Sequence, residues 1–307
     1  MRIAITGASG FLGTHLVASA LQAGHEVVAL SRNPQRGSPA PCVTWRRGDL
    51  AEPASLRTAF SGCDVVIANA ALAPGRGPAD DDAFEVANVR GARHQVDAAA
   101  DAGVDRVVYI STVAVYRTRL GRRLAEGAER IDPDHRRFDW NQLTTDPRYA
   151  RSKARAEQAV WSAAVARGLA LTSLRPGPIY GEHDHKMTQR YVDMVQRWPC
   201  LAPTVRLPHV HARDVADAAL RASERPATAG RAYNTTGDAV SVHRALRALA
   251  KALGRPRPMP IPVPLVVRFD DRRARRDLGF RPRSVEEGMT QVAAWISGRR
   301  SAEASVP

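Results

Sequence analysis

The stretch RIAITGASGFLG, residues 2–13, joins a short β-branched run to a segment with helical spacing, residues 11–24. Glycine allows the backbone to turn sharply and to approach a phosphate closely. The first turn of the following helix offers unpaired N–H groups and the positive end of its dipole. A loop in this context predicts a site for the pyrophosphate of a dinucleotide. The residues predicted to contact it are Gly7, Gly10, Phe11, Leu12 and Gly13.

Downstream of this loop, short apolar runs alternate with longer helical patterns. Regular strand–helix alternation implies parallel strands joined by right-handed crossovers. The predicted fold class is therefore α/β, with a Rossmann-type doubly wound parallel sheet. The predicted strands are 2–6, 26–30, 43–47, 64–71, 106–111 and 169–174, with 231–236 as an additional strand, and the predicted helices of this part are 11–24, 84–102 and 147–167.

From about residue 177 the alternation loosens. Helical patterns cover 186–198, 213–224, 241–253 and 285–298, and the proline-rich RPRPMPIPVP (255–264) is predicted to be extended. This part has too few strands for a sheet of its own, so we interpret it as a smaller C-terminal substrate-binding cap. The predicted division is a cofactor-binding domain at 1–176 plus about 205–236, a cap at about 177–204 and 237–300, and a loose tail at 301–307.

The composition is that of an ordinary globular chain of 307 residues with a formal net charge of +14. The arginines are scattered without interleaved aromatic residues, so we expect no nucleic-acid partner. The three cysteines, Cys42, Cys63 and Cys200, fit neither a zinc spacing nor a disulfide framework. No apolar run approaches the roughly 18 residues that a membrane span needs. We therefore expect a soluble, cytoplasmic protein with no membrane partner and no metal.

Residues after the second and third predicted strands bear on the choice of cofactor. A carboxylate after the second strand would bind the adenosine ribose of NAD, but this chain has Ser31 and Arg32 there, with Arg36 as a second basic candidate. A hydroxyl and a guanidinium suit a 2′-phosphate, so NADP(H) is favoured over NAD(H). Asp49 and Leu50 follow the third strand, where Asp49 would either face the adenine amino group or cap a turn.

The segment YARSK (149–153) supplies a candidate acid–base group. Tyr149 and Lys153 are four residues apart on a predicted helix and so share one face. Lysine occurs at only three positions among the 45 basic residues, so its use at position 153 is informative. A nearby ammonium would lower the pKa of the phenol. Ser111 and Thr112, at the end of the fifth predicted strand, are alternative candidates for the hydroxyl that orients the substrate oxygen.

These features together resemble the extended short-chain dehydrogenase/reductase family, also described as the NAD-dependent epimerase/dehydratase family. The resemblance rests on Tyr-x-x-x-Lys, on the spaced glycines and on the hydroxyl-bearing strand end. It extends to NVRGARHQVDAAADAGVDRVVYIS (88–111), LRPGPIYG (174–181), HVHARDVADA (209–218) and DLGFRP (277–282).

The resemblance implies roles for residues that match the family's motifs. The family's hydroxyl stands four residues before the strand-end tyrosine, here Tyr116, which selects Thr112. Asn88 matches a helix asparagine that supports the site, with a purely structural hydrogen bond as the alternative. His209, His211 and Asp214 suggest a metal, but the family has none, and Asp214 is predicted to cap a helix. Residues implied to line the cofactor are Ala70, Ala71, Lys153, Pro176 and Ile179.

The implied chemistry is hydride transfer between a nicotinamide and a carbonyl or hydroxyl group, with Tyr149 as general acid/base. Family dehydratases carry an Asp-Glu pair after the threonine, whereas this chain has Val113 and Ala114. A nucleotide-sugar epimerase is the alternative, and a non-catalytic NADP(H) sensor is the second. The substrate, a small carbonyl, an alcohol or a nucleotide sugar, is not readable, nor is the role of the arginine-rich segment 117–141. Family members also imply a homodimer through helices 84–102 and 147–167.

Overall fold

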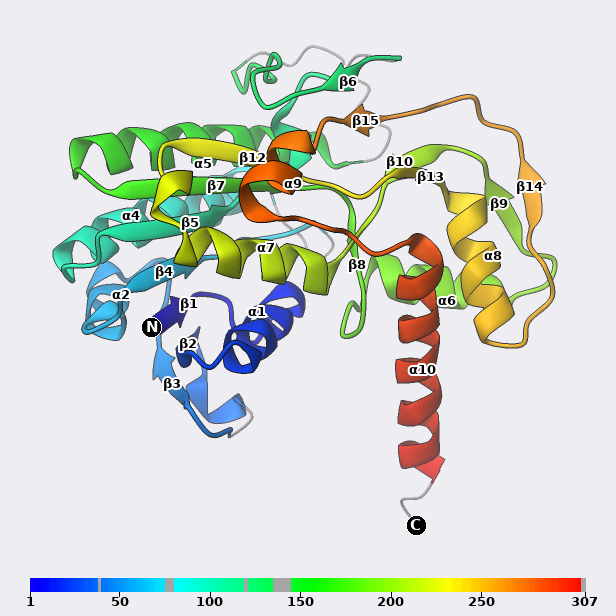
Figure 1. Ribbon diagram of the computed structural model, residues 1–307, viewed down its shortest axis with the longest axis horizontal. Coiled ribbons are helices and arrows are strands. Elements are labelled where there is room, and N and C mark those ends of the chain that lie inside the picture. Colours follow the sequence, from blue (N-terminus) through cyan, green and yellow to red (C-terminus); the bar gives the residue numbers. More distant parts are fainter. Residues whose placement is uncertain (38–39, 75–79, 119–120, 135–144, 305–307) are drawn as a thin grey trace.

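A seven-stranded parallel sheet forms the centre of the computed structural model, which describes residues 1–37, 40–74, 80–118, 121–134 and 145–304 (Figure 1). The strand order is β12-β7-β5-β4-β1-β2-β3. The apolar residues of the inner strands are buried on both faces, as parallel strands require, whereas Val43 and Trp45 of the edge strand β3 are only partly buried. The predicted doubly wound Rossmann-type sheet is confirmed. The strands are β1 (Arg2–Ile5), β2 (Glu26–Ser31), β3 (Val43–Arg47), β4 (Val65–Ala68), β5 (Arg106–Ile110), β7 (Ala170–Pro176) and β12 (Arg231–Thr235).

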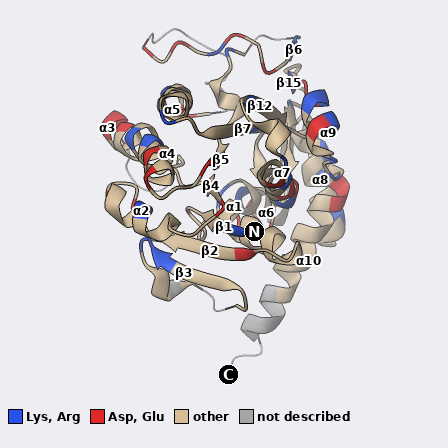
Figure 2. Ribbon diagram, turned by 60° about the vertical axis from the view of Figure 1, so that its left-hand side comes forward, with Lys and Arg blue, Asp and Glu red and all other residues tan. Residues whose placement is uncertain are grey.

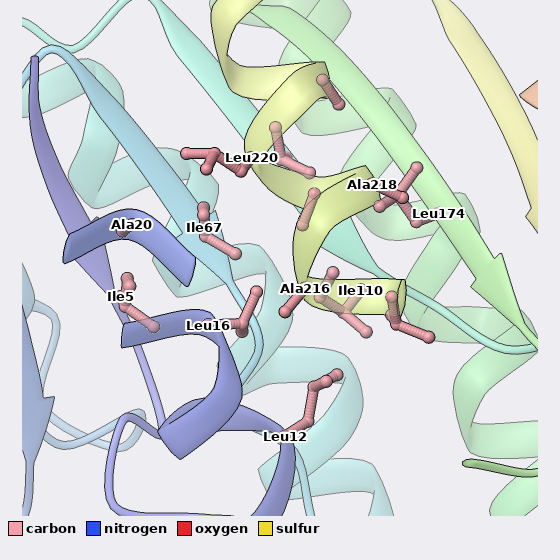
Figure 3. Packing of buried hydrophobic residues seen from close by; sticks show 14 of the residues in the cluster. Ile5, Leu12, Leu16, Ala20, Ile67, Ile110, Leu174, Ala216, Ala218 and Leu220 are labelled. Carbon is pink, nitrogen blue, oxygen red and sulfur yellow. The ribbon is translucent and has the colours of Figure 1, made fainter. Parts of the chain in front are cut away.

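Helices cover both faces of this sheet. Strand residues alternate between two apolar clusters: Ile3 and Ile5 pack toward α1 (Phe11–Gln22) and α7 (Ala212–Glu224), while Ala4 packs toward the opposite face. Figure 3 shows Leu12, Leu16 and Leu220 meeting the strands in the first cluster. The second cluster is covered by α2 (Pro53–Phe60), α4 (Gly91–Asp101) and α5 (Pro147–Ala166).

Several elements differ from the sequence-based prediction. Helix α2 and the short helix α9 (Arg272–Leu278) were not predicted. Residues 69–71 leave the strand, because β4 ends at Ala68. The helix expected at 84–102 consists of α3 (Asp81–Phe84), a π-helical stretch η2 (Glu85–Arg90) and α4. Short 3-10 turns, in addition, are η1 (Pro34–Arg36), η3 (Val113–Val115) and η5 (Pro226–Thr228).

The C-terminal part has its own apolar cluster beside the sheet. Tyr191, Leu246 and Met289 belong to this cluster, which is built mainly by α6 (Met187–Gln196), α8 (Val242–Ala252) and α10 (Val285–Ala304). Residues 301–304 of the predicted loose tail therefore continue α10. The short strands pair in twos: β8 (Ile179–Tyr180) with β11 (Val210–His211), β9 (Leu201–Pro203) with β14 (Met259–Ile261), β10 (Arg206–Pro208) with β13 (Ala239–Ser241), and β6 (Arg123–Leu124) with β15 (Arg268–Phe269).

Polar contacts join the C-terminal part to the helices of the sheet. His15 on α1 lies 3.0 Å from the carbonyl oxygen of Glu182, whose carboxylate lies 3.2 Å from Nε2 of His211. The prediction that Asp214 caps α7 is wrong, because His211 is the capping residue, accepting from the N–H of Arg213. Asp214 instead accepts hydrogen bonds from the backbone and guanidinium of Arg283, at 3.0 and 2.9 Å.

Charged residues are distributed over many elements, including β3, α7 and α9 (Figure 2). In the arginine-rich segment, Arg117 pairs with Glu129 at 2.8 Å and Arg130 lies 3.6 Å from Glu157. Residues 119–120 and 135–144 of that segment lie outside the described residues, as does the side chain of Arg36. No helix among the described residues is long and apolar enough to cross a membrane.

Candidate active site at the carboxyl ends of the strands

The glycine loop between β1 and α1 is shaped by contacts that exclude side chains. Gly7 has a φ of +63°, which L-residues rarely adopt, and its carbonyl accepts the N–H of Gly10 at 2.9 Å. A Cβ at Gly13 would lie 2.8 Å from the Cα of Ala8 and closer still to the Gly7 carbonyl. The loop therefore requires glycine at two of the three predicted positions for reasons of geometry.

Thr6 fastens this loop to the end of β4. Its hydroxyl donates to Gln95 on α4 at 2.6 Å and accepts the N–H groups of Asn69 and Ala70, each at 2.9 Å. The Asn69 amide donates back to the Thr6 carbonyl at 3.2 Å. Ala70, predicted to line the cofactor, thus lies against the glycine loop, and Ala71 follows it in the same partly buried segment.

The N-terminus of α1 is suited to an anion. Its N-cap is Gly10, with no side-chain cap and no acidic residue in the first turn. Helix N-terminal N–H groups without a side-chain acceptor bind phosphate oxygens well. The turn that a dinucleotide's pyrophosphate would need is therefore present, and Phe11 and Leu12 begin the helix at this point.

The residues predicted to select the cofactor lie at the ends of β2 and β3. Ser31 Oγ is 3.4 Å from Ser9 Oγ on the glycine loop, and Arg32 is exposed next to it. Among the described residues, no acidic side chain pairs with Arg32. Asp49 accepts the N–H of Ala51 at 3.0 Å, which is the turn contact considered for it, and Leu50 packs against Gly91.

Lys153 lies at the carboxyl end of β5 with 2% of its surface exposed. Its ammonium donates to the Tyr109 hydroxyl and to the Ile110 carbonyl, both at 2.9 Å, and sits 4.5 Å from the centre of the Tyr109 ring. Burial lowers the pKa of Lys153 to about 8, against the opposing effect of the Glu157 carboxylate. Tyr109 was not singled out from the sequence, although it immediately precedes the end of the strand.

Tyr149 is partly buried one helical turn earlier, with its ring 6.2 Å from that of Phe84. Burial raises the pKa of Tyr149 to about 12. The expectation that Lys153 lowers this pKa is therefore wrong for the protein alone, because the ammonium is directed at Tyr109 and Ile110 and the desolvation of the phenol dominates.

The two candidate hydroxyls after β5 have different surroundings. Ser111 is buried and donates to the carboxylate of Glu157 on α5. Thr112 is only partly buried, and its oxygen accepts the N–H of Ala114 at 3.2 Å, which leaves its proton for another acceptor. The burial of Ser111 leaves Thr112 as the more accessible of the two hydroxyls.

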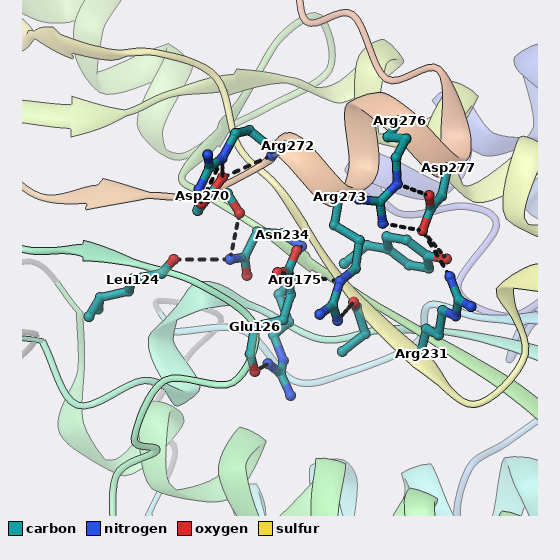
Figure 4. A network of polar contacts seen from close by, with 12 residues as sticks. Leu124, Glu126, Arg175, Arg231, Asn234, Asp270, Arg272, Arg273, Arg276 and Asp277 are labelled. Carbon is teal, nitrogen blue, oxygen red and sulfur yellow. Dashed lines mark hydrogen bonds and ion pairs between the residues drawn. The ribbon is translucent and has the colours of Figure 1, made fainter.

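A buried ion pair lies below these residues. Nε of Arg175, on β7, donates to both carboxylate oxygens of Glu157 at 3.0 and 3.1 Å. Burial alone would raise the pKa of Glu157, but Arg175, Ser111 and Arg130 together lower it below its usual value. Arg175 also donates to the Tyr116 hydroxyl at 2.6 Å, and Tyr116 donates to Asn234 on β12 at 2.7 Å. Figure 4 shows Asn234 and Arg175 in the network that extends to Leu124 and Asp270.

Asn88, predicted to support the site, is buried in η2. Its side chain accepts the N–H of Leu72 at 2.7 Å and donates to the Leu72 carbonyl at 3.0 Å. It also donates to Ser152 at 2.9 Å, and Ser152 donates to the Tyr149 carbonyl at 2.8 Å. Asn88 therefore connects the segment after β4 to the first turns of α5, which matches the structural role considered for it.

The remaining predicted positions lie after β7. Pro176 is the last residue of β7 and is buried, and Ile179 begins β8 at the margin of the core. His209 is buried, with Tyr191 OH 2.9 Å from its Nε2, and burial lowers its pKa to about 4. Within the described part of the chain, no three His, Cys, Asp or Glu side chains are arranged to hold a metal ion.

The structure thus combines a parallel doubly wound sheet, a glycine loop after β1 and a Tyr-x-x-x-Lys pair in which Tyr149 is partly buried and Lys153 is buried. The model of the NAD dependent epimerase/dehydratase family matches residues 3–235. The chain belongs to this family.

Individual relatives and solved structures have a third or less of their aligned residues identical to this chain. A 2-alkyl-3-oxoalkanoate reductase from Stenotrophomonas maltophilia (strain K279a) is 33% identical over 197 residues, covering 64% of this chain and 56% of the relative. The chain thus spans about half the length of that curated relative. The NADPH complex of the yeast methylglyoxal/isovaleraldehyde reductase Gre2 superimposes with a TM-score of 0.82 at 18% identity, covering 98% and 99% of the two chains. The NAD+ complex of WbmH from Bordetella bronchiseptica gives 0.79 at 21% identity, covering 96% and 98%.

The contacts of Gly13 generate a prediction for the loop. Gly13→Ala should abolish measurable binding of a nicotinamide dinucleotide in calorimetric titration and destabilise the fold by about 1–3 kcal/mol, because the new methyl group meets backbone that cannot move aside. Gly298→Ala is the matched control, since a Cβ there meets nothing within 4 Å in helix α10. The control should retain binding and gain up to about 1 kcal/mol. Equal effects of the two changes would contradict this account of the loop.

Proposed function

We propose that this protein is an NADP(H)-dependent oxidoreductase that reduces a carbonyl group of a small molecule or oxidises the corresponding alcohol. The observation that carries the proposal is the buried Lys153, which contacts the end of β5 one helical turn from Tyr149. The glycine loop and the N-terminus of α1, which has no side-chain cap, lie at the same edge of the parallel sheet. The names of relatives support the reductase reading, since they include a 2-alkyl-3-oxoalkanoate reductase and a 3-beta-hydroxysteroid dehydrogenase.

Each residue has a proposed role in the reduction of a carbonyl. A bound nicotinamide supplies the hydride. Tyr149 gives its proton to the carbonyl oxygen as negative charge develops there. Thr112 donates a hydrogen bond to the same oxygen, which positions it and stabilises its charge. Lys153 supplies a positive charge one helical turn from the phenolate that remains, while its ammonium is held by the Tyr109 hydroxyl and the Ile110 carbonyl. Asn88 acts through Ser152 and Leu72, so we regard it as a positioning residue.

The preference for NADP(H) rests on the end of β2. Ser31 lies near the glycine loop, Arg32 is exposed beside it, and no acid occupies the position that would bind the ribose hydroxyls of NAD. Solved structures of similar fold contain either NADPH or NAD+. The remaining contacts proposed for the cofactor are those of Asp49, Leu50, Ala70, Ala71, Pro176 and Ile179.

A nucleotide-sugar epimerase is the alternative, because similar folds include a UDP-galactose 4-epimerase. The absence of an acid after β2 is the feature that disfavours it. A non-catalytic NADP(H) sensor is the second alternative, disfavoured by the retention of both Tyr149 and Lys153. Purified protein with NADPH and a panel of carbonyl compounds separates the three: a reductase consumes NADPH, an epimerase interconverts nucleotide sugars without net consumption, and a sensor does neither.

Tyr149→Phe tests the proposed acid. Loss of the hydroxyl should lower kcat for carbonyl reduction by at least about 10²-fold, the usual contribution of general acid catalysis, while NADPH affinity stays within a few-fold. The measurement is steady-state consumption of NADPH together with calorimetric binding. Full activity in the variant would show that another group delivers the proton.

Arg32→Ala tests the cofactor preference. Loss of a charge-assisted contact with a 2′-phosphate should weaken NADPH binding about tenfold or more and leave NADH binding nearly unchanged. Arg93→Ala, a substitution of another exposed arginine on α4, is the matched control and should affect neither. If NADPH and NADH binding weaken equally, Arg32 does not recognise the phosphate.

Tyr109→Phe tests how Lys153 is held. Lys153 is charged below its pKa of about 8 and neutral above it, so kcat/KM for reduction should fall as the pH rises through about 8. Without the Tyr109 oxygen, the ammonium loses one acceptor and its charged form is less stable, so this decline should begin at lower pH. Tyr233→Phe, which removes a phenol hydroxyl bonded to Asp277 instead, should leave the pH profile in place. An unchanged profile in Tyr109→Phe would exclude the positioning role.

A further inference from the structure

The outer edge of the C-terminal part carries an unusual set of exposed apolar side chains. Seven large hydrophobic residues are exposed among the described side chains, and four of them lie here: Trp198 at 63%, Leu201 at 50%, Met259 at 49% and Ile261 at 41%. Leu201 and Met259 are register partners in the parallel pair β9–β14, and Ile261 is two residues further along the same strand. Trp198 stands three residues before Leu201. We call these four residues the apolar edge.

The strand pair itself explains why these residues share a face. Successive side chains of a strand point to opposite sides, so Leu201, Met259 and Ile261 point one way and Ala202 the other. Ala202 is fully buried in the cluster formed with α8. A strand pair with one side packed on a helix usually carries polar residues on its other side. Figure 1 shows β9 and β14 beyond α8, at the side of the molecule away from the central sheet.

Basic residues adjoin the apolar edge in sequence. Residues 197–207 and 251–263, which contain both strands, include five Lys or Arg and no Asp or Glu. Arg197 adjoins Trp198, and Arg255 and Arg257 precede Met259; all three are exposed. An apolar surface bordered by basic side chains has the composition of a segment that lies at the interface of an anionic lipid bilayer.

Two other occupants fit this surface less well. In a symmetric dimer the same patch would face itself, and the arginines of one copy would oppose those of the other. An added β-strand would need free N–H groups on the outer strand, but Pro258, Pro260 and Pro262 have none. A lipid surface requires neither, because it accepts the projecting side chains directly and supplies the opposite charge.

We propose that the apolar edge docks this protein reversibly on anionic lipid bilayers, with Trp198, Leu201, Met259 and Ile261 entering the interfacial layer and neighbouring arginines contacting lipid phosphates. The contact is peripheral and needs no membrane-spanning helix. The expectation from sequence that the protein has no membrane partner considered only spanning segments. The proposal is independent of the reaction proposed above, since it concerns residues on the far side of α8.

The test is co-sedimentation of the full chain with vesicles of phosphatidylcholine alone or mixed with phosphatidylglycerol. We expect binding to the mixed vesicles, weakened by high salt because exposed charges are screened. Trp198→Ser combined with Leu201→Ser should reduce the partition coefficient about tenfold or more, since two large apolar side chains no longer leave water. Arg255→Gln combined with Arg257→Gln should reduce binding to the anionic vesicles.

Matched controls distinguish binding through the apolar edge from nonspecific binding of exposed apolar or basic residues elsewhere on the protein. Val165→Ser changes a side chain that is 81% exposed on α5, and Arg93→Gln changes an exposed arginine on α4; neither should alter binding. Thermal unfolding should be nearly unchanged in all variants, because the substituted side chains are exposed. Absence of vesicle binding, or binding that the Trp198 and Leu201 changes leave intact, would overturn the proposal. A change of oligomeric state in those variants, without vesicle binding, would identify the surface as a self-association face instead.

Discussion

The buried ion pair between Glu157 and Arg175 is the constraint on which the arrangement of the site depends. A charge in this position is tolerated only with a partner of good geometry, and Arg175 provides two hydrogen bonds from Nε alone. Glu157 is four residues after Lys153 on α5, so the pair fixes the rotation of the helix that carries the catalytic candidates. Because Arg175 lies near the end of β7, the same contact also fixes the height of α5 along the sheet.

The burial of these residues also determines the direction in which the pKa values of Lys153 and Tyr149 shift. The low dielectric that strengthens the Glu157–Arg175 pair also penalises the lone ammonium of Lys153 and the phenolate form of Tyr149. Both pKa values shift in the direction that favours the neutral form: the pKa of Lys153 falls to about 8, and the pKa of Tyr149 rises to about 12. The phenol of Tyr149 is therefore protonated near neutral pH, which is the form that the proposed proton transfer to a carbonyl oxygen requires.

The parts of the molecule that could be predicted from sequence are those specified by short spacings. The glycine loop, the strand–helix alternation and the pairing of Tyr149 with Lys153 along one helix face all depend on neighbours within a few residues. Helix α2 and helix α9 escaped prediction because they are short, with eight and seven residues, so that neither gives a long periodic pattern. Partners brought together by the fold were also missed: Tyr109 with Lys153, and Thr6 with Gln95, Asn69 and Ala70. Asp214 was misassigned because its partner, Arg283, is 69 residues away.

The proline-rich segment 255–264 is a further case in which the local conformation could be predicted from sequence but its neighbours in the fold could not. Proline made its extended conformation predictable, but the consequence of that conformation depends on what lies beside it. Pairing with β9 places Met259 beside Leu201, with Ile261 two residues further along, so that exposed apolar residues of two strands lie next to one another. The same prolines deny the outer edge its N–H groups, which protects it from pairing with another strand. The surface thus combines exposed apolar side chains with a strand edge that cannot accept another strand, a combination that favours a lipid bilayer over a β-strand of another protein as the partner.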